Sequence, residues 1–197
     1  MKKIAVLFIC VFLLSGCQNI NEMAVDEIMG LFSSEVKKAN TYRTGYKYNL
    51  PSMMQVDVNE SYIEVISTNR YNYYFYVDIV SYYNNIGNYY EVNKDSFYSS
   101  KYEINDKISY IEVNIQENDK YLIEIMYNYA KIEVMVDIDD LNLAIINAIN
   151  ILNSVTYNDL IIENYLGNDV LNFTEEIYDI FKTNDTNNSL VFKTEKE

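Results

Sequence analysis

The sequence predicts an α+β fold, in which a mostly antiparallel β-sheet is packed by an N-terminal helix and by a longer helix near residues 140–155. Apolar and polar residues alternate through much of residues 61–136, with the two-residue period of a half-buried strand. On either side, in residues 21–39 and 141–154, apolar residues instead recur at the spacing of one face of a helix. The predicted order is therefore helix, several strands, helix.

The first predicted helix, in residues 21–39, is short and amphipathic. Its apolar residues at helical spacing are Met23, Ile28, Leu31 or Phe32, and Val36. Asp26 and Glu27 lie near its start, whereas Lys37 and Lys38 lie near its end, and this order of charges interacts favourably with the helix dipole. A helix is thus predicted to open the domain.

Strands are predicted after this helix. Residues 42–48 alternate tyrosine with other residues, and the segment closes before Pro51, because a residue that precedes proline prefers an extended backbone. Further strands are predicted in residues 61–67 and 70–83. In the second of these, one face carries Tyr71, Tyr73, Phe75, Val77 and Ile79, and the other carries Tyr74, Tyr76, Asp78, Val80 and Tyr82. One of the two faces is predicted to be core.

Residues 84–106 are rich in Asn and Ser and predict a loop region, with a weak strand near residues 97–102. Residues 109–116 and 121–129 then alternate around a short polar turn, which predicts a β-hairpin. A third strand is predicted in residues 131–136. These strands follow one another directly, so an antiparallel meander is expected.

The second predicted helix, in residues 141–154, has the widest apolar stripe in the chain. Its members are Leu141, Ile145, Ala148 or Ile149, Leu152 and Val155. Such a stripe should pack on the sheet. Beyond it, residues 160–166 predict an appended strand, residues 174–181 a short turn segment, and residues 183–197 a polar tail.

The segment YRTGYKYNLP, the meandering strands and the final LNLAIINAINILNSVTYND helix together resemble the PsbP/Mog1-like family of α/β/α sandwiches. The resemblance covers residues 41–159 and rests on the order and general pattern of the elements. Members of that family are largely non-enzymatic assembly or interaction scaffolds. The resemblance therefore implies a scaffold role and carries over no specific binding residue.

The start of the chain predicts export. Lys2 and Lys3 precede an unbroken apolar run of eleven residues at positions 4–14. At about 1.5 Å per residue this run is too short to cross a bilayer as a permanent helix, which needs roughly 20 residues. A basic start, a short apolar run and small residues are the layout of a secretory signal peptide.

The four residues Leu14, Ser15, Gly16 and Cys17 resemble the bacterial lipobox. The resemblance implies diacylglycerol transfer to the Cys17 sulfur, cleavage before Cys17, and retention on the outer face of the cytoplasmic membrane. The alternative is an ordinary signal peptide with an incidental cysteine at its cleavage site. The predicted organisation is a removed signal peptide at 1–16, a lipidated tether at 17–20, one globular domain at 21–182 and a polar tail at 183–197.

Cysteine usage agrees with this anchor, because Cys10 would leave with the signal peptide and Cys17 would be the only cysteine left. No intramolecular disulfide could then form in an oxidising compartment. Two acyl chains on one cysteine are enough for lasting membrane attachment. The abundance of Asn, Ile, Tyr and Lys is typical of an AT-rich genome and indicates a low-GC Gram-positive bacterium.

Composition excludes several function classes. The chain has no histidine, which excludes histidine-based triads and the common zinc sites. Its net charge of −14 becomes −16 once Lys2 and Lys3 are removed, and so acidic a surface repels nucleic acid. Neither a cofactor nor a nucleic-acid partner is predicted.

Twenty-one tyrosines are the most unusual feature of the composition. The candidate binding surface predicted from them consists of Tyr73, Tyr74, Tyr76, Tyr82 and Tyr83. Tyrosine offers a rigid apolar face and a polar tip, which suit contact with sugars or peptides. The alternative is that tyrosine fills strand positions because it favours sheets.

The acidic run at Asp137, Asp139 and Asp140 has some likeness to calcium loops, but it lacks the glycine and the distal glutamate of an EF-hand. Its position at a strand end, where the aspartates can cap the next helix, explains it, so no metal site is predicted.

The predicted function is a membrane-anchored binding or assembly module without catalytic activity, with an unknown protein or glycan as its partner. The alternatives are a carboxylate-dependent surface enzyme acting on a glycan or peptide, and a solute-binding lipoprotein.

Overall fold

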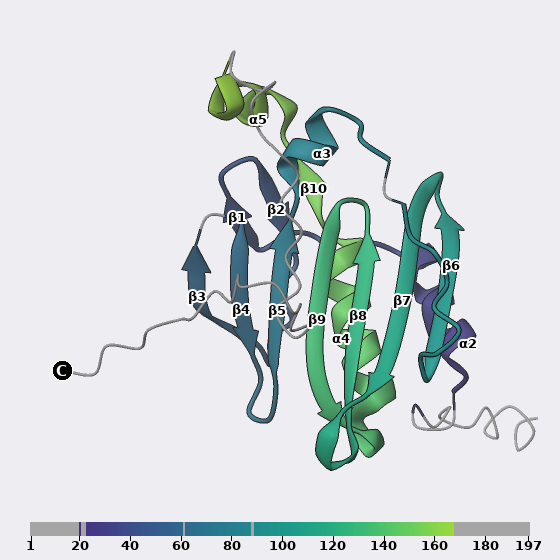
Figure 1. Cartoon of the computed structure of the whole chain (residues 1–197). Coiled ribbons are helices and arrows are strands. Elements are labelled where there is room, and N and C mark those ends of the chain that lie inside the picture. The colour runs from purple at the N-terminus through teal and green to yellow at the C-terminus, as the bar shows by residue number, and fades with distance from the viewer. Residues whose placement is uncertain (1–19, 21–22, 61, 88, 168–197) are drawn as a thin grey trace, which may run out of the picture.

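The computed structural model describes residues 20, 23–60, 62–87 and 89–167. It contains two antiparallel sheets together with helices, so the predicted α+β class is confirmed (Figure 1). The larger sheet has, in spatial order, β3 (Gln55–Glu60), β4 (Ile63–Ser67), β5 (Asn72–Val77), β9 (Ala130–Asp137), β8 (Lys120–Tyr127), β7 (Lys107–Ile115) and β6 (Tyr98–Ile104). The smaller sheet has β1 (Thr41–Arg43), β2 (Tyr46–Tyr48) and β10 (Thr156–Tyr157).

One helix, α4 (Leu141–Asn153), lies across one face of the larger sheet and contacts β8 and β9 (Figure 1). The shorter helical elements are α2 (Val25–Met29), η2 (Gly30–Ser33), α3 (Ile79–Tyr83), η3 (Glu117–Asp119), η4 (Ile138–Asp140) and α5 (Asp159–Leu166). Both α2 and η2 contact α4. Among the described residues, no helix is long and apolar enough to cross a membrane.

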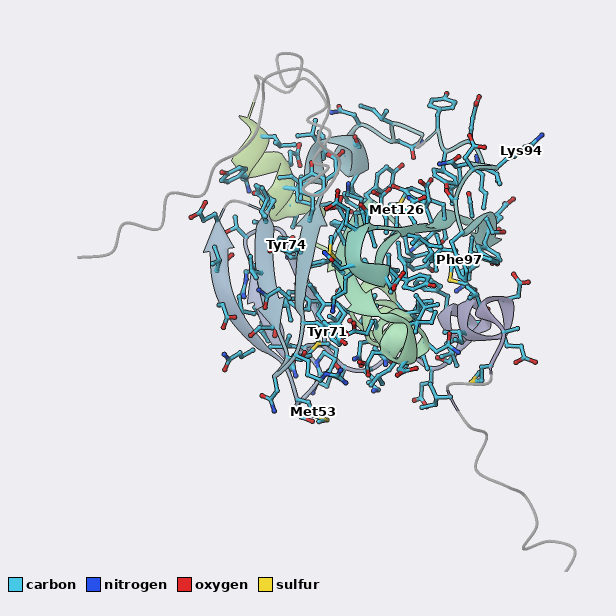
Figure 2. All side chains as sticks on the ribbon, turned by 60° about the horizontal axis from the view of Figure 1, so that its bottom comes forward. Met53, Tyr71, Tyr74, Lys94, Phe97 and Met126 are labelled. Atoms are coloured by element: carbon cyan, nitrogen blue, oxygen red, sulfur yellow. The ribbon has the colours of Figure 1, made fainter. Side chains whose placement is uncertain are left out.

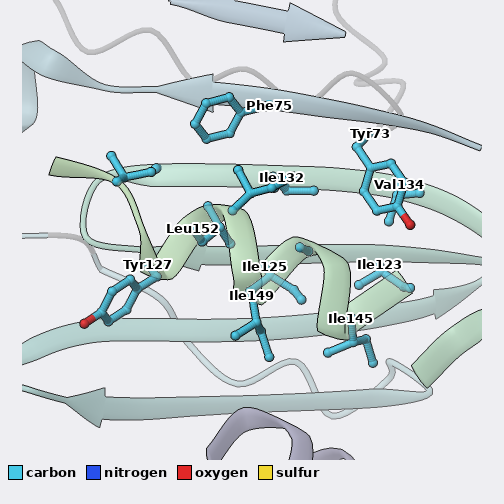
Figure 3. Packing of buried hydrophobic residues seen from close by; sticks show 14 of the residues in the cluster. Tyr73, Phe75, Ile123, Ile125, Tyr127, Ile132, Val134, Ile145, Ile149 and Leu152 are labelled. Atoms are coloured by element: carbon cyan, nitrogen blue, oxygen red, sulfur yellow. The ribbon is translucent and has the colours of Figure 1, made fainter. Parts of the chain in front are cut away.

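The apolar core lies between α4 and the sheet (Figure 3). The predicted stripe is confirmed, since all of its members are buried: Leu141, Ile145, Ala148, Ile149, Leu152 and Val155. They meet alternate residues of the central strands, including Phe75, Ile125 and Ile132, which are fully buried. Each buried large aliphatic side chain contributes about 1.5–3 kcal/mol, so this layer is the main source of stability.

The opposite face of the larger sheet is more polar. Glu112, Glu124 and Glu133 lie opposite one another on β7, β8 and β9, and all three are buried. Tyr74 and Met126, labelled in Figure 2, belong to the same face. The two faces therefore follow from strict alternation along each strand.

The predicted strand over residues 70–83 is wrong in its second half. β5 ends at Val77, and the Asp78 side chain then accepts a hydrogen bond from the Ser81 backbone N–H at 2.8 Å. An aspartate in this position satisfies a free N–H of a first helical turn, so α3 begins here. The alternation of apolar residues through the junction concealed the change.

The single strand predicted in residues 42–48 is instead the β1–β2 hairpin, which turns at Thr44 and Gly45. Gly45 has φ of +87°, a conformation that glycine adopts without steric cost. The strand predicted in residues 160–166 is helix α5, because the Asn158 side chain accepts from the backbone N–H of Ile161 and caps it.

The predicted N-terminal helix is shorter than expected, since α2 has five residues and passes into the 3₁₀ helix η2. Strand β3 was not predicted. The hairpin of β7 and β8, strand β9 and the weak strand that became β6 are confirmed. The predictions for residues 1–16, 174–181 and 183–197 lie outside the described residues.

Candidate functional site

A fully buried carboxylate marks the most unusual polar site of the described chain. Glu64 of β4 has no exposed surface. It accepts three hydrogen bonds, from Arg43 Nη2 at 2.6 Å, from the Tyr46 hydroxyl at 2.8 Å and from the Tyr48 hydroxyl at 2.7 Å. A buried charge without such partners would cost several kcal/mol, so these donors are needed for the fold.

The β1–β2 hairpin positions all three donors. Arg43 and Tyr46 pair across the hairpin, and Tyr48 lies two residues further along β2 on the same side. The turn is closed tightly by helix α5, because a Cβ added at Gly45 would lie 2.8 Å from Ile162 Cγ1. The sequence between Arg43 and Tyr46 therefore fixes where the donors meet Glu64.

The protonation states make this site neutral overall. Burial raises the pKa of both tyrosine hydroxyls well above its ordinary value, and Glu64 raises it further. For Arg43, burial lowers the pKa, but Glu64 more than offsets this effect and the pKa is raised. Tyr46 and Tyr48 therefore remain donors, and the Arg43 charge is balanced by that of Glu64.

A pocket of about 220 Å³ lies beside the Arg43–Glu64 pair. Its lining residues are Arg43, Thr44, Tyr46, Asn59, Tyr62 and Tyr165. Three tyrosine rings form its apolar surface, with Tyr62 lying 6.1 Å from Tyr46 and 5.7 Å from Tyr165 between ring centroids. The rings of Tyr62 and Tyr165 meet edge to face, at 80°. We call this the Arg43 pocket.

Arg43 Nε is buried and has no hydrogen-bond partner within the described part of the chain. The Tyr62 hydroxyl is buried as well, and the Tyr165 side chain beside it is close enough to act as a hydrogen-bond partner. Burial, and then the neighbouring Tyr165, raise the pKa of Tyr62, so its hydroxyl stays protonated. The Tyr62 backbone has φ of +73°, which is rare for a bulky residue and costs of order 1–3 kcal/mol. The pocket therefore holds an unused donor on Arg43 and a strained backbone at Tyr62.

Chemically, the Arg43 pocket offers hydrogen-bond donors and aromatic surface. The Glu64 carboxylate next to the pocket already accepts three hydrogen bonds, so it is not placed as a free acid or base. This arrangement suits recognition of a ligand that accepts hydrogen bonds.

The five tyrosines of the predicted binding surface are distributed over different parts of the fold. Tyr73 is buried against α4, where Asn147 donates to its hydroxyl at 3.3 Å. Tyr74 and Tyr76 are half-buried on the opposite face of the sheet, whereas Tyr82 and Tyr83 lie on α3. The structure thus brings Tyr74 and Tyr76 to one face but does not bring all five together.

The aspartates predicted to cap α4 have another arrangement. Asp140 occupies the N-cap position without a hydrogen bond to the helix, which corrects that prediction. Its carboxylate instead binds Arg70 at 2.7 Å and accepts from the Tyr71 hydroxyl. Asp137 pairs with Lys120 at 2.6 Å. Within the described ranges, no group of three or more metal-binding side chains is arranged to hold an ion.

The N-terminal end of the described chain is fastened to α4. Asn142, in the first turn of α4, donates to the carbonyl oxygens of Ile20 at 2.8 Å and Met23 at 2.9 Å. The predicted lipobox residues Leu14, Ser15, Gly16 and Cys17 lie outside the described residues. Ile20 therefore marks the end of the domain at which the predicted anchor joins it.

The Arg43 pocket lies at the other end of α4. The Asn49 backbone N–H donates a hydrogen bond to the Ser154 hydroxyl, at the C-terminal cap of that helix. Strand β10 and helix α5 follow this cap in the chain (Figure 1). Thirteen helical residues separate the two ends by about 20 Å.

Comparison with protein-family models and with curated proteins found no match to this chain.

Sequence reasoning missed Arg43, Tyr62 and Glu64 as site residues. One signal was present, because Thr44 and Gly45 between two tyrosine-rich runs are typical of a hairpin turn. The pairing of Arg43 with Glu64, however, depends on packing between two sheets, and no local pattern indicates it.

Proposed function

We propose that this chain is an extracytoplasmic lipoprotein, held to the membrane by a diacylglyceryl group on Cys17, whose domain is a binding module without catalytic activity. The observation that carries the proposal is the sequence Leu14-Ser15-Gly16-Cys17 directly after a basic start and a short apolar run. A diacylglyceryl group joined to the Cys17 sulfur by a thioether carries two acyl chains, which give lasting attachment without a membrane-spanning helix.

The fastening of Ile20 supports this proposal. Three residues after Cys17 span at most about 10 Å, so the domain would stay close to the membrane. Because Asn142 holds Ile20 at the N-terminal end of α4, the Arg43 pocket lies at the far end of the helix from the attachment point. The donors and aromatic rings of the Arg43 pocket support a binding role.

The net charge of the chain restricts the chemical class of its partner. A chain of charge −14 gains little from contact with nucleic acid or with anionic lipid, because both are recognised mainly through Lys and Arg. A protein or glycan of the surrounding wall or medium suits this surface better.

The membrane attachment is tested by feeding cells labelled palmitate and separating proteins by detergent phase partition. We expect label on the wild-type chain in the detergent phase and none on Cys17→Ser. The matched control is Cys10→Ser, which alters a cysteine of the predicted signal peptide and should keep the label. Label that persists in Cys17→Ser, or a cytosolic chain that retains residues 1–16, would contradict the proposal.

A second candidate is a carboxylate-dependent surface enzyme, and the row of Glu112, Glu124 and Glu133 favours it. Adjacent carboxylates can divide the roles of acid and base. Each of these residues, however, already has a polar partner. Tyr90 donates to Glu112 at 2.6 Å, Tyr110 donates to Glu124 at 2.7 Å, and Lys131 forms an ion pair with Glu133 at 2.8 Å. None lines the Arg43 pocket. We therefore rank the binding module first.

A further inference from the structure

We propose that the Arg43 pocket binds a neutral sugar residue at an accessible end of a glycan. This inference rests on the proposed function, because it names the ligand class of that binding module. Three independent features of the pocket support it: its charge balance, its buried polar atoms and its aromatic walls.

The charge balance disfavours ionic ligands. Arg43 and Glu64 form a pair at 2.6 Å, so the guanidinium carries no excess charge with which to attract an anion. The chain as a whole has a charge of −14, which repels anions further. For the same reason the pair offers a cation no excess negative charge. A neutral ligand needs no such charge.

The polar atoms of the pocket favour a ligand that is rich in hydroxyl groups. Arg43 Nε is buried and has no hydrogen-bond partner among the described residues, and the Tyr62 hydroxyl is buried beside the Tyr165 side chain. A buried donor without an acceptor is unfavourable, so a ligand that supplies an acceptor gains affinity. A sugar hydroxyl can accept from Arg43 Nε–H, and its neighbour can exchange a hydrogen bond with Tyr62 in either direction.

The walls and the size of the pocket fit one sugar ring. Tyr46, Tyr62 and Tyr165 provide aromatic surface against which the C–H face of a ring can pack. The volume of about 220 Å³ is below the roughly 300–1,000 Å³ of pockets for drug-sized ligands. Tyr165 is 55 % exposed at the rim, where Thr44 and Asn59 are also exposed. The rest of a glycan could therefore continue into solvent.

The test uses the full lipoprotein in a detergent that has no sugar headgroup. Saturation-transfer NMR is recorded with methyl β-glucoside and with N-acetylglucosamine, and the same measurements use benzoate and choline as an anionic and a cationic probe. We expect saturable binding of at least one of the two sugars and neither binding nor competition by the charged probes. Preferential binding of benzoate or choline, or no saturable sugar binding by the folded protein, would overturn the proposal.

Three variants connect the binding to the pocket. Tyr62→Phe removes one donor and should weaken sugar binding about three- to tenfold. Tyr165→Ala removes an exposed aromatic wall and should weaken it by a similar factor. The matched control is Tyr42→Phe, since Tyr42 lies next to Arg43 on β1 but is 65 % exposed and does not line the pocket.

Circular dichroism and thermal unfolding confirm that each variant is folded. If Tyr62→Phe and Tyr165→Ala both bind sugar as tightly as wild type, the pocket is not the site and the proposal fails. The palmitate experiment is independent of this result. A labelled protein that binds no sugar would refute only the ligand class, whereas an unlabelled protein that binds sugar would refute only the anchor.

Discussion

The two ends of α4 are both held by charged side chains, but the charges are buried to different degrees. At the pocket end, Glu64 is fully buried and Arg43 is 21 % exposed. At the N-terminal end of α4, which we call the anchor end because the proposed lipid attachment lies nearest to it, Arg70 is 62 % exposed and pairs with Asp140, which is 16 % exposed. Asp137 is 44 % exposed there, and its partner Lys120 also lies near solvent. Water and salt weaken exposed pairs, so only the pocket end depends strongly on its ion pair.

This difference indicates where the molecule tolerates change. An exposed pair contributes about 0–1 kcal/mol, whereas removal of one partner of a buried pair leaves a charge without compensation. The anchor end should therefore accept substitutions, and the pocket end should lose stability when either its charges or its turn are altered. Three experiments test this comparison.

The largest effect is expected from Arg43→Met, which leaves the buried Glu64 carboxylate with only two tyrosine donors. The free energy of unfolding should fall by about 3 kcal/mol, as for other broken buried pairs. Lys120→Met is the matched control at the anchor end and should cost less than about 1 kcal/mol. Urea unfolding followed by circular dichroism measures both values. Equal losses in the two variants would show that burial does not separate the two ends.

A smaller effect is expected from Gly45→Ala in the turn that closes the Arg43 pocket. The added Cβ needs a positive φ and meets Ile162 at 2.8 Å, so we expect a loss of about 1–3 kcal/mol. Gly30→Ala, at the first residue of η2, is the control, because Gly30 has φ of −58° and nothing lies within 4 Å of an added Cβ. Thermal unfolding should show little change or slight stabilisation for this control. A cost at Gly30 as large as that at Gly45 would contradict the comparison.

The smallest effect concerns pH at the anchor end. The hydroxyls of Tyr102 and Tyr98 donate to Asp26 and lower the pKa of its carboxyl below the ordinary value of 3.8. The charged form is thus favoured by folding, so its contribution is present above about pH 4 and is lost as the pH falls through the folded pKa. Because Asp26 is exposed, this contribution is a few tenths of a kcal/mol.

Asp26→Asn measures this contribution. The difference in unfolding free energy between wild type and the variant should be present at pH 7 and should shrink between pH 4 and pH 2. Urea unfolding at several pH values determines it. A difference that grows on acidification would show that the two hydroxyls do not favour the charged carboxylate.

The helices and strands that could be predicted from sequence are those that pack one apolar face against the core, because this packing sets the spacing of their apolar residues. The stripe of α4 and the alternation of β7, β8 and β9 were clear because each has one apolar face against the core. Residues 78–83 and 159–166 could not be assigned by alternation alone. Their conformation depends on the side chains of Asp78 and Asn158, which start a helix within an otherwise strand-like sequence.

The site was harder to predict than the fold. The tyrosine clusters in the sequence predicted an exposed binding surface. In the structure, however, Tyr73 faces the core, whereas its neighbour Tyr74 faces the other side of the sheet. Glu64 and Arg43 are separated by 21 residues and meet only because the β1–β2 hairpin packs against β4. Long-range packing of this kind leaves no periodic signal in the chain.

The bonds from Asn142 to the Ile20 and Met23 carbonyls have a mechanical consequence. A pull that enters the domain from its N-terminal side must break these two bonds before it can unwind the first turn of α2. The load therefore passes early into α4, the helix that packs against the centre of the larger sheet. The Asn142 side chain thus helps the N-terminal end of the domain to resist a pulling force.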